Sequence, residues 1–360
     1  MVDSHKYVSV QMLRAVAAMM VVAFHLPHYL GGPPGQDLPI LNGGVDLFFV
    51  ISGFVMMIST RHRRDGGADL ASFAAQRLWR IVPLYWLATL VFIAFLAADG
   101  RLVQWPETLR SLLFIPYYDV TTQLVQPVLP VGWTLNLELA FYGVFAATLL
   151  LRPWRQVMAI GALFGAAVAL RIVMQPPASS VLFFYTSPIL FEFVAGMVVA
   201  LAAGHLRRLP LWTGLLLIAA AAVAALALGL TMDLPRTIAL GGPAIALVSG
   251  AVIIDRRLGA RAAWPLPLLG DASYSMYLTH LMVLSAMAPL ALRLPPWLGA
   301  VALFTACLVI AVVVYLAVER PILRLRRSLR LPGNIPRRSA SNAVVTGRGA
   351  LATRAACSRR

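Results

Sequence analysis

The sequence predicts an all-α, polytopic integral membrane protein with about ten transmembrane helices and both termini in the cytoplasm. Three observations lead to this prediction. First, 60% of the 360 residues are hydrophobic and only 12% are charged, about half the charge of a soluble domain. Second, the apolar residues fall in runs of about twenty, the length of a helix that crosses a bilayer. Third, arginines concentrate in alternate loops, a pattern typical of multi-pass proteins.

Ten apolar runs account for the predicted spans, each about as long as a membrane-crossing helix. The seventh and eighth are the least distinct, because only residues 232–235 separate two Ala- and Gly-rich runs. Residues 111–118 are a candidate for a short re-entrant or interfacial segment. In order, the spans are expected at Val8–Leu30, Leu41–Thr60, Leu78–Ala98, Val131–Leu151, Gln156–Met174, Val181–Ala203, Leu211–Thr231, Arg236–Ile254, Leu268–Ala291 and Trp297–Val318.

Positive charge is distributed unequally between alternate loops. The loops on the same side of the membrane as the amino terminus hold many basic residues, and eleven arginines follow Glu319. Because Lys and Arg stay on the cytoplasmic side of such proteins, both termini are expected in the cytoplasm. The net charge of +16 therefore reflects topology. No nucleic-acid partner is expected, since no basic face interleaved with aromatic residues accompanies this charge. The loops assigned to the outside hold only Arg101, Arg110, Arg236 and Arg293.

Residues 1–330 are expected to form one transmembrane domain. The first apolar run is too long for a cleavable signal and Arg14 interrupts it, so it is expected to stay in the mature protein. Residues 331–360 are rich in Arg, Ser, Ala and Gly, which predicts a disordered, basic cytoplasmic tail that contacts anionic lipid. Cys307 and Cys357 are far apart and indicate neither a disulfide nor a metal site.

Arg14 and His25 lie inside the first apolar run, and they are the most informative residues of the chain. Eleven positions at about 100° each place both side chains on one helix face, about 16 Å apart along the axis. Ionisable groups at membrane depth are costly, so they are read first as a functional site facing the protein interior. The alternatives are an Arg14 that extends to the interface and a structural His25.

The predicted topology sorts the other polar residues by depth. Arg14 and Arg80 lie toward the inner half of the membrane, with Arg77 at its mouth. An arginine-lined phosphate site beneath an acid–base site suits a long donor with a phosphate head, such as acyl-coenzyme A. A proton relay through the same residues explains the layers equally well. The acids and histidines gather in the outer half: His25, Asp46, Glu138, Glu192 and His280.

Five features, in this order and topology, resemble motifs of the membrane acyltransferase family often called acyltransferase 3. The first is the pair Arg14 and His25. The others are GGVDLFFVISGFVM (residues 43–56), RLWRIVPLYW (residues 77–86), SYSMYLTH (residues 273–280) and Glu319-Arg320-Pro321. The resemblance covers nearly all the predicted spans. It implies a transferase that moves an acyl group, usually acetyl, from cytoplasmic acyl-coenzyme A to a sugar hydroxyl.

A further stretch resembles exopolysaccharide-production and O-antigen acetyltransferases. It comprises LLFIPY (residues 112–117) and GWTLNLELAFY (residues 132–142). Many family members have two adjacent acids in the second string. Here Leu139 stands at the second position, so Glu138 is the only acid of the motif, which argues against a role for paired carboxylates.

The resemblance also implies a role for each site residue. His25 is the general base on the acceptor hydroxyl, or a transient acyl carrier, and Asp46 orients it. Glu138 joins the catalytic group on the acceptor side, and no metal or resident cofactor is expected beside acetyl-coenzyme A as donor. Structural roles remain open for Asp46 as the partner of an arginine, and for Glu138, Glu192 and His280. The donor-binding residues are Arg14, Arg77 and Arg80, and the acceptor-binding residues are Trp133, Tyr277 and His280.

Competing functions remain open at this stage. The preferred one is acylation of a surface or exported polysaccharide at the bacterial inner membrane, with membrane lipid and a glycan as partners. A variant is acylation of a small glycosylated metabolite such as a macrolide. A transporter or flippase would use the same buried charges as a path, and an inactive export partner would not need both Arg14 and His25. Association with a second copy or with polysaccharide-assembly machinery is left open.

Overall fold

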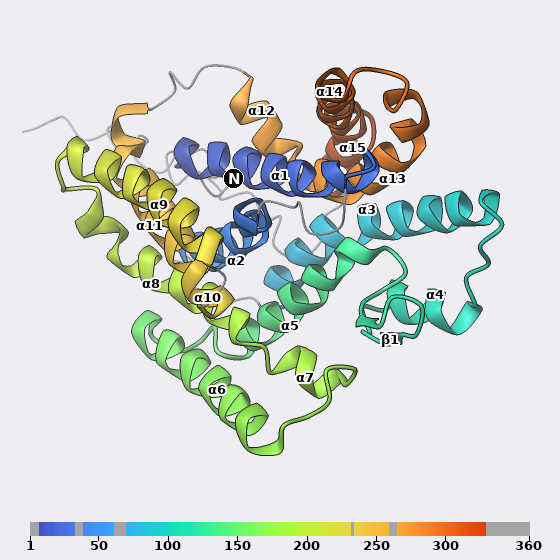
Figure 1. Ribbon diagram of the computed structural model, residues 1–360. Coiled ribbons are helices and arrows are strands. Elements are labelled where there is room, and N and C mark those ends of the chain that lie inside the picture. The colour runs from blue at the N-terminus through green and yellow to red at the C-terminus, as the bar shows by residue number, and fades with distance from the viewer. Residues whose placement is uncertain (1–6, 33–38, 61–69, 232–233, 259–264, 329–360) are drawn as a thin grey trace, which may run out of the picture.

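The computed structural model describes residues 7–32, 39–60, 70–231, 234–258 and 265–328, and these are mostly helical (Figure 1). The predicted all-α class is confirmed. The tail predicted for residues 331–360 lies outside the described residues. The elements are α1 (Val8–Tyr29), α2 (Pro39–Thr60), α3 (Leu70–Ala98), α4 (Trp105–Leu112), β1 (Tyr118–Asp119), β2 (Leu124–Val125), α5 (Trp133–Ala147), α6 (Pro153–Met174), α7 (Val181–Tyr185), α8 (Phe191–Leu206), α9 (Leu211–Thr231), α10 (Arg236–Ala239), α11 (Gly241–Leu258), α12 (Leu266–Asp271), α13 (Ser273–Ala291), α14 (Pro296–Val314) and α15 (Arg320–Ser328).

Within the described residues, seven helical segments are long and apolar enough to cross a membrane. The helices α5, α9 and α13 stand where the other three spans were predicted, so the count of ten and the side of the termini stay predictions. With 15 residues, α5 is shorter than the roughly 20 residues of a typical span. The seven segments are Val8–Tyr29, Ile40–Thr60, Phe73–Ala98, Pro153–Met174, Val181–Leu206, Arg236–Arg257 and Pro296–Arg326.

Several predicted spans are interrupted rather than continuous. The sixth separates into α7 and α8, because Pro188 lacks an N–H and holds Ser187 in an extended conformation. The ninth separates into α12 and α13 at Ala272. Between the third and fourth, the structure places α4 and an antiparallel hairpin in which Tyr118 faces Val125. These two elements lie together on the right of Figure 1.

The centre of the bundle is α2, which packs most extensively against α8 and also against α1 and α11. Glycines allow the closest approach. A Cβ added at Gly53 would lie 2.0 Å from the carbonyl oxygen of Phe193, and one added at Gly196 would lie 2.0 Å from that of Val50. Small residues at such crossings let two backbones touch, which is how membrane helices gain packing energy.

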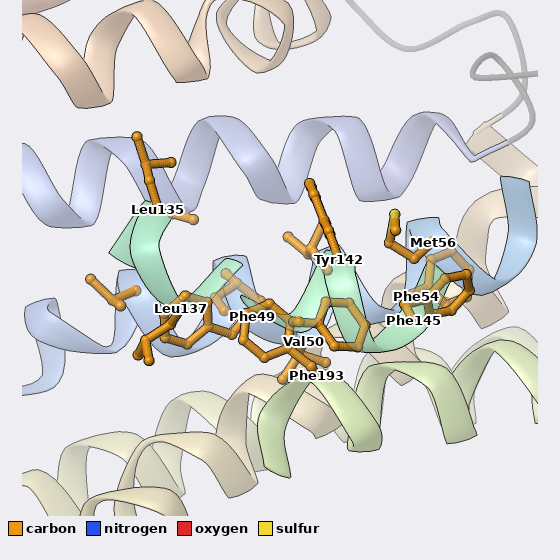
Figure 2. Close-up of a cluster of buried hydrophobic side chains, with 14 of the residues drawn as sticks. Phe49, Val50, Phe54, Met56, Leu135, Leu137, Tyr142, Phe145 and Phe193 are labelled. Atoms are coloured by element: carbon orange, nitrogen blue, oxygen red, sulfur yellow. The ribbon is translucent and has the colours of Figure 1, made fainter. Parts of the chain in front are cut away.

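Aromatic side chains fill the core beside this crossing. The ring of Phe141 stacks on that of Phe193 at 4.4 Å between centroids, and Phe49 lies 4.6 Å from Phe193 on the other side. Figure 2 shows α5 laid across α2 and α8, with Phe145 and Leu137 buried in the same cluster. Because α5 is anchored by these rings, its other face is free to present polar side chains.

We expect Gly196→Val to lower the stability of the protein by at least about 3 kcal/mol, the upper range for overpacking a core. The new side chain would force α2 and α8 apart, so the folded fraction in detergent and the apparent melting temperature should both fall. Gly143→Ala is the control, because a Cβ there meets nothing within 4 Å and Ala favours a helix by about 1 kcal/mol. An unchanged melting temperature for Gly196→Val would contradict this packing.

Candidate active site

A cavity of about 100 Å³, here called the inner cavity, lies between α1, α2, α3, α5 and α13. This cavity is lined by all three of the arginines that were predicted from the sequence to bind the donor: Arg14, Arg77 and Arg80. Three guanidinium groups in an apolar bundle attract phosphate groups, since charge-assisted hydrogen bonds are strong at low dielectric. The structure therefore brings the predicted donor-binding residues together.

Hydroxyl groups and aromatic rings hold these arginines in place. Arg14 Nη2 donates to Ser273 Oγ at 3.1 Å, and Arg77 Nη2 donates to Ser59 Oγ at 2.7 Å. The Arg77 guanidinium also lies over two rings, 5.8 Å from the centroid of Phe73 and 5.9 Å from that of Tyr142. Hydroxyl groups and rings thus orient both guanidinium groups at the cavity wall.

Glu138 lines the inner cavity, beside the arginines, although the depth argument grouped it with the outer acids. The physical reason is the register of α5: Leu135, Glu138 and Tyr142 fall on one helix face, and that face borders the inner cavity. Ser52 Oγ donates to Glu138 Oε1 at 2.9 Å, and the Tyr142 hydroxyl donates to the same oxygen. Glu138 is thus an oriented carboxylate close to the donor side.

The quoted sequence motifs meet around this cavity. The hydroxyl of Tyr274, in SYSMYLTH, donates to the carbonyl of Ile81, in RLWRIVPLYW, at 2.8 Å. In the same motif, Ser275 Oγ donates to buried Glu319 Oε2 at 2.5 Å. Glu319 belongs to a π-helical turn, Tyr315–Glu319, that joins α14 to α15, and such turns are frequent at functional sites. Segments about 200 residues apart therefore form one wall.

A second cavity of about 510 Å³, here called the outer cavity, is lined by His25 and Trp133 among others. Its other walls come from the β1–β2 hairpin, the end of α6, α7 and Arg236. All of these belong to, or adjoin, the loops that the arginine distribution assigned to the outside. Parts of several loops predicted to face the same side of the membrane thus contribute to one cavity.

Two histidines lie side by side, but only His25 lines the outer cavity; His280, predicted to contact the acceptor, does not. The rings of His25 and His280 are 5.1 Å apart between centroids, and their Nδ1 atoms lie 2.8 Å from the carbonyl oxygens of Val21 and Tyr277. A carbonyl only accepts, so each Nδ1 carries the proton, and in the neutral ring Nε2 keeps its lone pair. His280 is fully buried behind His25. His25 therefore has the tautomer that a general base needs at Nε2.

Asp46 is held by an arginine. Its two oxygens accept from Arg236, at 2.7 Å from Nη2 and 3.2 Å from Nε, and Arg236 Nη2 also donates to Asn42 Oδ1 at 3.2 Å. Asp46 is fully buried and the Arg236 side chain is 34% exposed. The arrangement is the neutralising pair, the structural role left open for Asp46. The His25 Nδ1–H, which Asp46 was expected to orient, donates instead to the Val21 carbonyl.

The two cavities share Val45 and Tyr277 in their walls. The Tyr277 hydroxyl donates to the Val131 carbonyl at 2.9 Å and lies 2.8 Å from Thr134 Oγ1. Tyr277, predicted to contact the acceptor, therefore stands between the arginines on one side and His25 on the other. This arrangement matches the single helix face deduced for Arg14 and His25.

Sequence reasoning missed several residues of the site. Tyr142 was part of a quoted string, and its position four residues after Glu138 would have predicted the contact. Arg236 had been counted only as an outer-loop charge. Ser52 also lies in a quoted string, and Arg171 lies in the apolar run of the fifth predicted span. A single polar residue in an apolar run does not reveal which helix will face it.

We expect Asp46→Asn to destabilise the protein by about 3 kcal/mol, because it leaves the Arg236 charge unmatched in a largely buried position. The double variant Asp46→Asn/Arg236→Gln should regain most of this loss, since it removes both charges. Thermal unfolding in one detergent measures the coupling between the two sites. Strictly additive losses would show that the pair is not a unit.

Comparisons with known proteins agree with this geometry. A family model described as an acyltransferase domain, acyltransferase 3, matches residues 7–316. The chain is 38% identical over 316 residues to the exopolysaccharide production protein ExoZ of Rhizobium meliloti (strain 1021), which covers 85% of this chain and 97% of that protein. It is 27% identical over 294 residues to the "Putative membrane-bound transacylase BcsY" of Komagataeibacter xylinus, covering 74% of this chain and 70% of that protein.

No solved structure matches the chain. The family model nevertheless spans the helices that build both cavities, from α1 to the π-helical turn. The resemblance seen in the sequence motifs is therefore confirmed, and this multi-pass membrane protein belongs to the acyltransferase 3 family of transferases.

Proposed function

We propose that the protein transfers an acyl group, in the first place acetyl, from cytoplasmic acyl-coenzyme A to a hydroxyl of an exported polysaccharide at the bacterial inner membrane. One observation carries the proposal: an arginine-lined cavity and a cavity that contains His25 meet at Tyr277 and Val45. The printed name of the relative from Rhizobium meliloti, an exopolysaccharide production protein, supports a polysaccharide as the acceptor.

The donor enters the inner cavity with its phosphates on Arg14, Arg77 and Arg80. Its pantetheine arm then extends toward Tyr277, so that the thioester reaches the boundary with the outer cavity. The hydroxyls of Ser273 and Ser59 orient Arg14 and Arg77 within the inner cavity, which supports this placement of the donor.

The acceptor hydroxyl enters the outer cavity beside His25. Nε2 of His25 takes the hydroxyl proton while the oxygen attacks the thioester carbonyl, and the carbon–sulfur bond then breaks to release coenzyme A as a thiolate. The imidazolium returns its proton to the leaving sulfur. In the alternative sequence, His25 first attacks the thioester itself and then passes the acyl group from its ring nitrogen to the sugar. Family membership favours both routes over a transport function.

His25→Ala should reduce transfer by about 100- to 10,000-fold, the usual contribution of a general base. The assay is transfer of radiolabelled acetyl from acetyl-coenzyme A to de-O-acylated surface polysaccharide by purified protein in nanodiscs. His28→Ala is the matched control, because His28 is exposed near the end of the same helix. Full activity of His25→Ala would remove His25 from the reaction.

Arg77→Ala and Arg80→Ala should raise the KM for acetyl-coenzyme A by about 10-fold or more, since each removes a charge-assisted contact of about 1.5–3 kcal/mol. The same variants should bind dephospho-coenzyme A with a smaller relative loss. Arg110→Ala, an exposed arginine of α4, is the control. Unchanged donor affinity in both variants would place the donor elsewhere.

A further inference from the structure

Two arginines line the outer cavity, and their charges are balanced differently. Asp46 holds Arg236 through both of its oxygens. Arg171, in the last turn of α6, donates from Nη1 to the Phe183 carbonyl at 3.1 Å. No carboxylate among the described residues forms an ion pair with Arg171. The outer cavity therefore contains one positive charge that the described part of the protein does not neutralise.

Arg171 is held in position by an aromatic ring and a backbone carbonyl, although it forms no ion pair with a described carboxylate. Its guanidinium carbon lies 3.5 Å from the centroid of the Phe183 ring, a close cation–π contact. Ser180 caps the start of α7 by accepting from the Phe183 N–H at 3.1 Å, so the ring and the carbonyl that hold Arg171 are themselves anchored. A guanidinium has five N–H donors, and the Phe183 carbonyl uses one. The remaining donors are pre-positioned at the cavity wall.

The rest of the outer cavity is suited to a sugar. Aromatic rings of Trp133 and Phe184 offer apolar faces, and the amides of Gln123 and Gln126 offer hydrogen bonds. Gln126 is 8% exposed, and its Nε2 donates to Thr122 Oγ1 at 2.8 Å, so its orientation is set within the hairpin. Apolar walls with a few fixed polar groups are typical of small-molecule sites. A guanidinium adds recognition of a carboxylate or a phosphate.

We propose that the acceptor glycan carries an anionic group, a carboxylate or a phosphate, and that Arg171 binds this group in the outer cavity. The proposal rests on the proposed function, because it takes the outer cavity as the acceptor site, and it adds the charge of the substrate. Binding an anion there matches the one unneutralised charge, which is otherwise costly in a partly buried position.

The test uses the de-O-acylated surface polysaccharide of the native cell and two treated forms of it. Carboxyl reduction removes uronate and pyruvyl charge, and cold aqueous hydrogen fluoride removes phosphodiesters. We expect wild-type protein in phosphatidylcholine nanodiscs to acetylate the untreated polymer with a kcat/KM about 10- to 100-fold above one of the treated forms. Which treatment lowers the rate identifies the anion. Equal rates on all three polymers would overturn the proposal.

Arg171→Gln should lower kcat/KM for the untreated polymer to the value of the sensitive treated form, and leave that form unaffected. Arg171→Lys, which keeps the charge, should retain part of the preference. The matched control is Arg155→Gln. Arg155 stacks over Trp154 at 5.2 Å near the other end of α6 and lies outside the outer cavity. An equal loss on all polymers in Arg171→Gln would mean a structural role and would contradict the proposal.

Two further measurements separate the sources of failure. Binding of the same polymers to His25→Ala protein reports the anion preference without transfer. If wild-type protein transfers no acetyl while this binding preference is preserved, the proposed function alone would be contradicted. Transfer at equal rates to the untreated and treated polymers would contradict the anionic acceptor and leave the proposed function intact. In nanodiscs that contain phosphatidylglycerol, a lipid headgroup would compete with the polymer. An Arg171→Gln effect that appears only there would assign the charge to lipid and overturn the proposal.

Discussion

Charges buried in an apolar helix bundle must be neutralised within the protein or turned toward a ligand, and this constraint organises the structure. Asp46 and Arg236 satisfy it internally. Arg14 and Arg77 instead line the inner cavity, where serine hydroxyls orient them.

The second solution depends on segments that are distant in sequence. The contacts of Tyr274 with Ile81 and of Ser275 with Glu319 join α13 to α3 and to the π-helical turn. The glycine crossing of α2 with α8 then fixes the depth of the aromatic core on which α5 rests. Motif segments that are scattered along the chain therefore lie together in the folded protein. This explains why short sequence strings that identify the family only weakly one by one identify it well in combination.

The helical class and the grouping of Arg14, Arg77 and Arg80 follow from the sequence, because hydropathy and buried charge are local properties. The break at Pro188 was also encoded locally, although apolar composition concealed it. The partner of Asp46 was not predictable, since Arg236 is 190 positions away and the sequence of neither segment indicates that the two will be in contact. The same holds for Glu138, whose side of the bundle depends on the rotation of α5 about its axis and not on its depth.

Tyr277 belongs to both cavities, and its hydroxyl is tied to Val131 and Thr134. A membrane enzyme that receives one substrate from each side has to let a two-carbon fragment through while blocking protons and salt. Under the proposed function, the phenol ring of Tyr277 lies where the two reactants would meet and where ions would have to be stopped. Substitutions at this one side chain would then affect both acyl transfer and the leakage of ions.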